Sequence, residues 1–169
     1  MLSTLKKRKS FIELADKLIS QIQFEIEQID HLFDAYQALF LHALQSIEPT
    51  LVEITALGSV LHSFYNGLEN IFVRIAKALD KNVPSDAQWH RELLLQMGES
   101  NPNRMPVLSS SVILRLNDYR SFRHFYRHSY SFFLEWDELE QLVKPLSALW
   151  TQVKIELQAF IDSLRNDKV

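Results

Sequence analysis

Residues 50–79 have the sequence TLVEITALGSVLHSFYNGLENIFVRIAKAL, and this stretch decides the fold. Its apolar residues recur at steps of three and four, which is the period of an amphipathic helix. They are Ile54, Leu57, Leu61, Phe64, Leu68, Ile71, Ile75 and Leu79. Thr50 and Glu53 have the spacing of a capping box. The sequence therefore predicts that a long helix with one apolar face begins at this point.

The helical pattern continues on both sides of this stretch. The segments expected to be helical are residues 4–46, 50–81, 85–97, 110–133 and 137–165. Capping boxes are predicted where the third and fifth of these begin, and Gly98 is the expected C-cap of the short third helix. Pro49 is expected to end the first helix, while Pro145 would kink the last helix or lie near its first turns.

The composition indicates the same class of fold. Hydrophobic residues make up 47% of the 169 residues, so the chain can bury a sizeable core. Only three Gly and five Pro occur, which leaves few turns and argues against an all-β protein. We expect an all-α protein in which residues 1–169 form a single domain, an antiparallel bundle of four long helices plus one short helix.

The sequence also argues against several classes of function. It has no Cys, which excludes disulfides and thiol catalysis, and no Gly-rich phosphate loop. His31, His42 and His62 stand on separate stretches without ligand spacing, so neither a metal site nor a cofactor is expected. No apolar run has the length of a membrane span and no signal peptide is recognisable, so we expect a cytoplasmic protein. The basic cluster at residues 6–9 is either a solvated first turn or a nucleic-acid contact.

Positive charge is concentrated in one segment. Residues 115–130 hold four Arg against one Asp, a net charge of +3, whereas the whole chain carries −3. The remaining residues therefore carry −6. A local basic patch on an acidic body favours a focused anion site over a broad nucleic-acid footprint.

Arg123, His128 and Tyr130 form the pattern Arg-x4-His-x-Tyr inside this basic segment. An Arg can hold a phosphodiester and stabilise charge on it, and a His can move the protons that RNA cleavage requires. On an ideal helix the side chains of Arg123 and His128 point about 140° apart, so they flank a site instead of stacking in it. Either the helix is locally distorted, or a second copy of the chain completes the site.

Polar residues near this pattern allow two interpretations each. The residues that share the basic face are Arg120, His124 and Arg127. That face is either an RNA-binding surface or an ordinary solvated one. Glu69, together with Asn66, is either a polar patch on a helix edge or a group that orients the Arg or His. His90 is either a capping or packing residue or a contact to substrate.

Arg123-x4-His128-x-Tyr130 resembles the signature of the HEPN superfamily, and in particular of its HepT toxin branch. The residue after the Arg is usually polar in that branch, often Asn or Asp, where this chain has His124. Two further stretches resemble the second and third helices of HepT-like proteins. They are residues 64–72, FYNGLENIF, and residues 89–94, WHRELL. The resemblance covers most of residues 50–165, whereas the first helix matches only in length and amphipathicity.

The resemblance implies a HEPN-type bundle that forms a homodimer and acts as a metal-independent endoribonuclease toxin. Arg123 would hold the scissile phosphate, His128 would transfer protons as the RNA 2′-OH attacks, and His124 would make a secondary polar contact. From their places beside this pattern, Arg120, Arg127 and Glu69 are predicted to bind the RNA or to support the site. The resemblance also implies an MNT-type nucleotidyltransferase antitoxin that transfers AMP to Tyr130, where the added phosphate would repel RNA.

A second function remains open at this point. Some members of this family are described as substrate- or nucleotide-binding subunits of nucleotidyltransferases, which would keep the bundle and the dimer without the chemistry. All three residues of the pattern are present in this chain. We therefore expect an active ribonuclease, with tRNA and mRNA as candidate substrates.

Overall fold

The computed structural model describes residues 2–45, 48–130 and 134–166. These residues form helices and no β-strand. The four long helices are α1 (Leu2–Ala35), α3 (Leu51–Ile75), α5 (Ser110–His128) and α7 (Leu146–Asn166). The shorter elements are α2 (Gln37–Gln45), the π-helical turn η1 (Ala76–Asp80), α4 (Trp89–Gln96) and α6 (Trp136–Val143).

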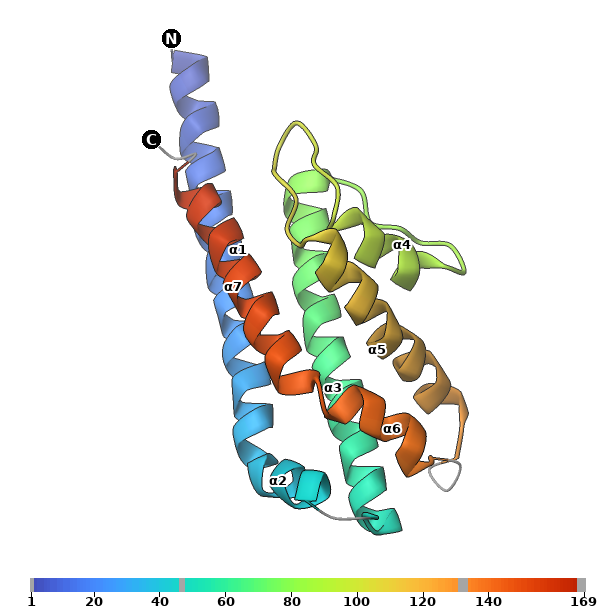
Figure 1. Ribbon diagram of the computed structural model, residues 1–169. Coiled ribbons are helices and arrows are strands. Elements are labelled where there is room, and N and C mark those ends of the chain that lie inside the picture. Colours follow the sequence, from blue (N-terminus) through green and yellow to red (C-terminus); the bar gives the residue numbers. More distant parts are fainter. Residues whose placement is uncertain (1, 46–47, 131–133, 167–169) are drawn as a thin grey trace.

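The long helices alternate in direction. α1 and α5 run one way through the bundle, and α3 and α7 run the other way (Figure 1). α3 contacts α1, α4, α5 and α6, so it is the central element. The predicted all-α fold with four long helices is confirmed. No helix in the described part of the chain is long and apolar enough to cross a membrane.

The core forms around α3, as the apolar stripe of residues 54–79 predicts. All eight residues of the stripe are buried, and Phe64, Leu68 and Ile71 have no exposed surface. Burying each such side chain stabilises the fold by about 1.5–3 kcal/mol. The capping box is also present, because Thr50 N donates to Glu53 Oε2 at 2.8 Å and Glu53 N donates to Thr50 Oγ1 at 3.3 Å.

The first predicted helix is divided in two. α1 ends at Ala35 and α2 begins at Gln37, and α2 packs against α3. After the break Phe40 stacks on Phe33 with 5.8 Å between ring centroids, and Ala43 is buried. The prediction of one helix over residues 4–46 was wrong. The apolar stripe continues through Tyr36 without a break, but α2 packs against α3 and therefore leaves the line of α1.

Two other predicted helix ends lie elsewhere in the structure. The capping box over residues 85–88 is absent, because Asp86 Oδ1 accepts from Gln88 N at 2.8 Å and α4 begins only at Trp89. Met97, one residue earlier than predicted, is the C-cap of α4. Asp86 thus forms a local turn with Gln88, two residues later, instead of capping the helix.

The fourth and fifth predicted helices also differ in their bounds. α5 ends at His128, where Ser129 adopts extended backbone, and the predicted end at residue 133 lies outside the described residues. The predicted cap over residues 137–140 is absent, since α6 begins at Trp136 with no side-chain capping bond. The single helix predicted over residues 137–165 is divided at Pro145 into α6 and α7 instead of being kinked, because Pro lacks the backbone N–H that would continue the helix.

A buried ion pair fixes the loop before α5. Arg104 has a side chain only 1% exposed, and its Nε lies 2.6 Å from Asp80 Oδ1. Its Nη2 donates to Asp80 Oδ2 at 2.8 Å and to the Gln96 carbonyl at 3.0 Å. This pair ties the loop to the end of η1 and to α4, which holds α4 beside the long helices.

Candidate functional site

Arg123 is held by two side chains of the central helix. Its Nε donates to Asn66 Oδ1, and its Nη2 lies 3.2 Å from Glu69 Oε1. Asn66 and Glu69 are three residues apart, so they project from the same face of α3 toward α5. Only 12% of the Arg123 side chain is exposed. The guanidinium is therefore fixed in orientation between the two helices.

Glu69 binds a second group from α4. Its Oε2 lies 2.5 Å from His90 Nδ1, and the His90 ring stacks on Trp89 with 3.6 Å between ring centroids. Glu69 is buried, and a buried carboxylate is tolerated only when it is paired and hydrogen-bonded. Here Arg123 and His90 provide that pairing, so one carboxylate joins α3 to both α4 and α5.

His62 completes the row of polar residues on α3. Its Nε2 lies 2.9 Å from Asn66 Nδ2, and its ring packs against Tyr126 at 5.0 Å between centroids. Burial lowers the pKa of His62, and the nearby charges of Arg123 and Arg127 lower it further. A neutral His62 accepts from the Asn66 amide, which turns Asn66 Oδ1 toward Arg123.

The same side of the molecule carries a cleft of about 490 Å³ between the start of α4 and the end of α5. The residues that line it are Ser85, Asp86, Ala87, Trp89, His90, Arg123, His124, Arg127 and His128. Arg127 and His128 are exposed at the end of α5. The cleft is thus lined by two guanidinium groups and three imidazoles against one carboxylate, that of Asp86, which suits an anion.

Most of the residues singled out in the sequence meet at this cleft. Arg123 and His128 both line it within one chain, although an ideal helix separates them by about 140°. The α-helix continues as far as His128, and the rings of His124 and His128 lie 4.9 Å apart. The cleft extends along more than one turn of α5 and thus takes in both residues.

Asn66 and Glu69 lie behind Arg123 and do not line the cleft themselves, and two residues of the basic segment lie elsewhere. Arg120 does not line the cleft, and its Nε donates to Asn117 Oδ1 at 3.0 Å. Tyr130 lies beyond the end of α5, so it does not share the helical face of Arg123. It is 72% exposed. It is still only two residues from His128, at the rim of the basic end of the helix.

Sequence reasoning missed the role of His62 and of residues 85–89. His62 looked isolated because only metal-ligand spacings were considered, yet it lies four residues before Asn66 and seven before Glu69. That spacing places all three on one helical face and could have linked them. Within the described part of the chain, no group of three or more His, Asp or Glu is placed to hold a metal ion.

Comparison with protein families gives one match. The model of the HepT-like protein family matches residues 56–164, which is more than half of the chain and includes α5 and most of α3. Neither a comparison with curated proteins nor one with solved structures finds a match. The matched segment contains Asn66, Glu69, Arg123 and His128. The chain thus belongs to the HepT-like family of the HEPN superfamily.

Proposed function

We propose that this protein is an endoribonuclease toxin that needs no metal ion and cleaves RNA at the cleft between α4 and α5. One observation carries the proposal. Arg123 is fixed by Asn66 and Glu69 at the wall of a cleft that His128 also lines. A pre-oriented guanidinium next to a solvated imidazole is the pair of groups that phosphodiester cleavage by an internal 2′-OH requires.

In this reaction Arg123 binds the scissile phosphate and stabilises the charge that develops on it. His128 accepts the proton of the 2′-OH as its oxygen attacks phosphorus. The bond from phosphorus to the 5′-oxygen then breaks, and that oxygen takes up a proton. The products are a 2′,3′-cyclic phosphate and a 5′-OH end. His124 and Arg127, which are exposed on the same turns of α5, contact the phosphate backbone.

The proposal includes a homodimer in which two α5 helices face each other. α5 ends at the surface with exposed basic residues, so a second copy would bring another Arg and His to the same RNA. Such a dimer would supply the second imidazole that protonates the leaving 5′-oxygen while His128 accepts the 2′-OH proton.

The proposal also includes control by a cognate MNT-type nucleotidyltransferase, which transfers AMP to Tyr130. The Tyr130 side chain is 72% exposed, so a second protein can reach its hydroxyl. It lies two residues after His128, close to the basic end of α5. A phosphate placed there would compete with RNA for the Arg and His side chains.

A non-catalytic subunit of a nucleotidyltransferase is the second candidate function. The observation that favours it is the ion pair between Arg123 and Glu69 at 3.2 Å, which already neutralises the guanidinium. In that case the cleft would bind a nucleotide or a substrate of the partner without cleaving it.

The deciding experiment is RNA cleavage in EDTA by the wild type, His128→Ala and His31→Ala. His31 is an exposed histidine of α1 that lines none of the clefts described, so it is the matched control. We expect cleavage by the wild type and His31→Ala and none by His128→Ala. Intact-mass measurement shows whether the purified protein carries AMP. Absence of cleavage by AMP-free wild type on total cellular RNA would overturn the ribonuclease and favour the subunit.

A further inference from the structure

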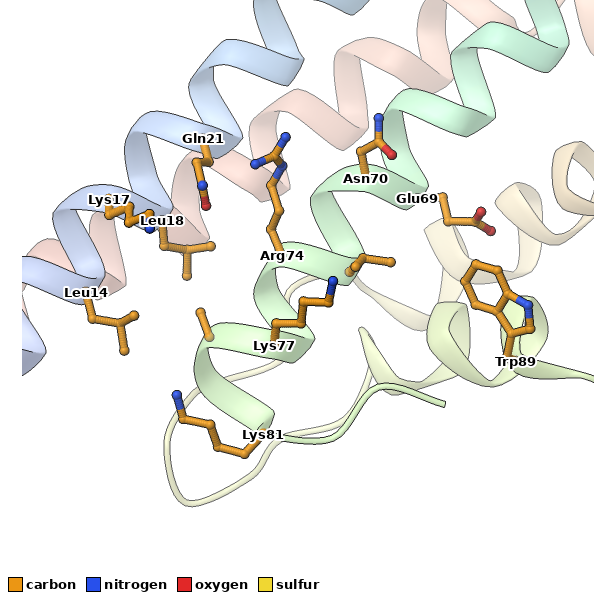
Figure 2. Close-up of a pocket in the computed structure, with 12 residues that line it drawn as sticks. Leu14, Lys17, Leu18, Gln21, Glu69, Asn70, Arg74, Lys77, Lys81 and Trp89 are labelled. Atoms are coloured by element: carbon orange, nitrogen blue, oxygen red, sulfur yellow. The ribbon is translucent and has the colours of Figure 1, made fainter. Parts of the chain in front are cut away.

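A second hollow lies between α1 and the end of α3. It has a volume of about 520 Å³, and cationic side chains line both of its sides. Figure 2 shows Lys17 on α1 across from Arg74 and Lys77, with Trp89 at the other end. Lys81, directly after η1, also lines it. We call this hollow the lysine groove.

The charge of the lysine groove is largely uncompensated. Arg74 is paired, because its Nη2 lies 3.0 Å from Glu25 Oε1. Lys17, Lys77 and Lys81 are exposed, and within the described part of the chain none of them has an ion pair or hydrogen bond. Three ammonium groups around one hollow repel one another, and an anion bound between them would relieve that repulsion.

The backbone that presents two of these lysines is irregular. α3 continues into the π-helical turn η1, which contains Lys77. Lys81 then adopts a left-handed conformation with φ of 55°, which is uncommon for a residue other than Gly. Single π-turns and such backbone outliers occur often at functional sites. The irregular turn is therefore an observation, separate from the charge, that points to binding at this end of α3.

The lysine groove is adjacent to the catalytic cleft. Trp89 lines both hollows, and Glu69 lines the lysine groove while it binds Arg123 of the cleft. Because Glu69 is paired with Arg123 and hydrogen-bonded to His90, the carboxylate presents little net charge to an anion there. Trp89 offers an aromatic surface at the junction. A positively charged path with an aromatic residue is a pattern that single-stranded nucleic acids bind.

We propose that the lysine groove binds the single-stranded RNA segment next to the scissile phosphate. Lys17, Lys77 and Lys81 contact successive phosphates, and the strand passes Trp89 into the catalytic cleft. The inference rests on the proposed ribonuclease function and extends it to the path of the substrate. An acidic protein segment is the competing occupant, but Trp89 lines both hollows, so the groove adjoins the cleft, and this favours RNA.

Binding of a single-stranded RNA tests the proposal. The probe is a fluorescent oligoribonucleotide of about 12 nucleotides, titrated with His128→Ala protein so that binding is not confused with cleavage. The test variant carries His128→Ala together with all three lysine changes, Lys17→Ala, Lys77→Ala and Lys81→Ala. The matched control adds only Lys144→Ala, an exposed lysine after α6 that lines neither hollow. Thermal unfolding of every variant checks that it is folded.

We expect the triple lysine change to weaken RNA binding about 10-fold or more at low salt. The slope of log affinity against log salt should also fall by about 2, since each lost contact to a single strand contributes roughly 0.7. Lys144→Ala should leave both quantities unchanged. Photo-crosslinking provides a second measurement. A 4-thiouridine RNA is cross-linked to His128→Ala protein that keeps its lysines, and we expect cross-links at residues 74–89 or at Lys17.

Three outcomes separate the two proposals. Unchanged RNA binding by the folded triple variant, with no cross-links in the lysine groove, would overturn the path of the substrate and leave the ribonuclease intact. If the triple variant still binds RNA but no longer binds the nucleotidyltransferase, the groove is a binding site for that protein. This outcome also overturns the RNA proposal. Wild type that neither binds nor cleaves RNA would remove both the groove proposal and the proposed function.

Discussion

Glu69 Oε1 lies 3.2 Å from Arg123 Nη2, and the two side chains are only 8% and 12% exposed. The same carboxylate binds His90 at 2.5 Å. A buried charge pair contributes little net stability, but removing one partner leaves the other charge buried and unpaired. The pair therefore matters chiefly because it orients Arg123 toward the cleft.

Glu69→Gln tests whether this orientation supports catalysis. The amide keeps the size and one oxygen acceptor of Glu69 but loses its charge, so Arg123 becomes a buried charge without a counterion. We expect RNA cleavage to fall at least about 10-fold, and stability to fall by up to about 3–5 kcal/mol. Single-turnover cleavage and urea unfolding measure the two effects. Glu27→Gln, at an exposed site on α1, is the control. An unchanged cleavage rate would show that Glu69 is only structural.

Arg123→Lys tests the need for a guanidinium. Arg123 reaches Asn66 through Nε and Glu69 through Nη2, and one ammonium cannot reproduce this pair of contacts. We expect single-turnover cleavage to fall by about 10²–10³-fold, as when a positioned donor to a developing charge is lost. Arg115→Lys, exposed on the same helix, should cleave RNA like the wild type. Cleavage at the wild-type rate by Arg123→Lys would contradict the proposed role.

The sequence predicts the long helices well because their apolar stripes are local patterns. The stripe that ends at Leu79 is buried as predicted, whereas the single helix predicted over residues 137–165 is divided at Pro145. The break at Tyr36 was not predictable, since it depends on how α2 packs against α3. The pattern Arg-x4-His-x-Tyr identified α5, whereas Arg123 and Glu69 lie 54 residues apart in the chain, and their contact depends on how α3 and α5 are placed. Periodicity does not determine such a placement.

Tyr130→Phe tests the proposed control by AMP transfer. Tyr130 is 72% exposed, and its change to Phe removes only the hydroxyl that would accept AMP. After co-expression with the cognate nucleotidyltransferase, we expect the wild type to gain the mass of AMP and lose cleavage. Tyr130→Phe should gain no mass and keep cleavage. Tyr36→Phe, at another exposed tyrosine, should behave like the wild type. AMP found on the Tyr130→Phe protein would place the modification at a different residue.

Asp80→Asn tests the ion pair that fixes the loop before α5. Burial alone would raise the pKa of Asp80, but hydrogen bonds from Arg104, Gln96 and Asn101 outweigh burial and lower it. The ionised form is thus favoured in the folded state. Its stabilisation is present above the ordinary pKa, about 3.9 for Asp in peptides, and is lost as pH falls below that value.

We therefore expect Asp80→Asn to lower the free energy of unfolding at pH 7 by about 3–5 kcal/mol, since it leaves buried Arg104 without its counterion. Below the ordinary pKa of an Asp, the difference between variant and wild type should shrink. Urea unfolding at several pH values measures both. Asp34→Asn, on an exposed site of α1, should show neither effect. A difference that is independent of pH would contradict the lowered pKa.

His62→Gln tests the neutral imidazole beside Asn66. Burial, followed by the charges of Arg123 and Arg127, lowers the pKa of His62, so the folded state favours its neutral form. The resulting stability is complete above the ordinary pKa of about 6.5 and is lost as pH falls below it, because the unfolded chain takes up the proton first.

Gln cannot titrate, although its oxygen can still accept from Asn66. The free energy of unfolding should therefore fall less between pH 7.5 and pH 5.5 in the variant than in the wild type, by roughly 1 kcal/mol per unit of lowered pKa. In the wild type, NMR titration should show His62 protonating below the ordinary pKa of about 6.5, and protonation at or above that value would refute the argument.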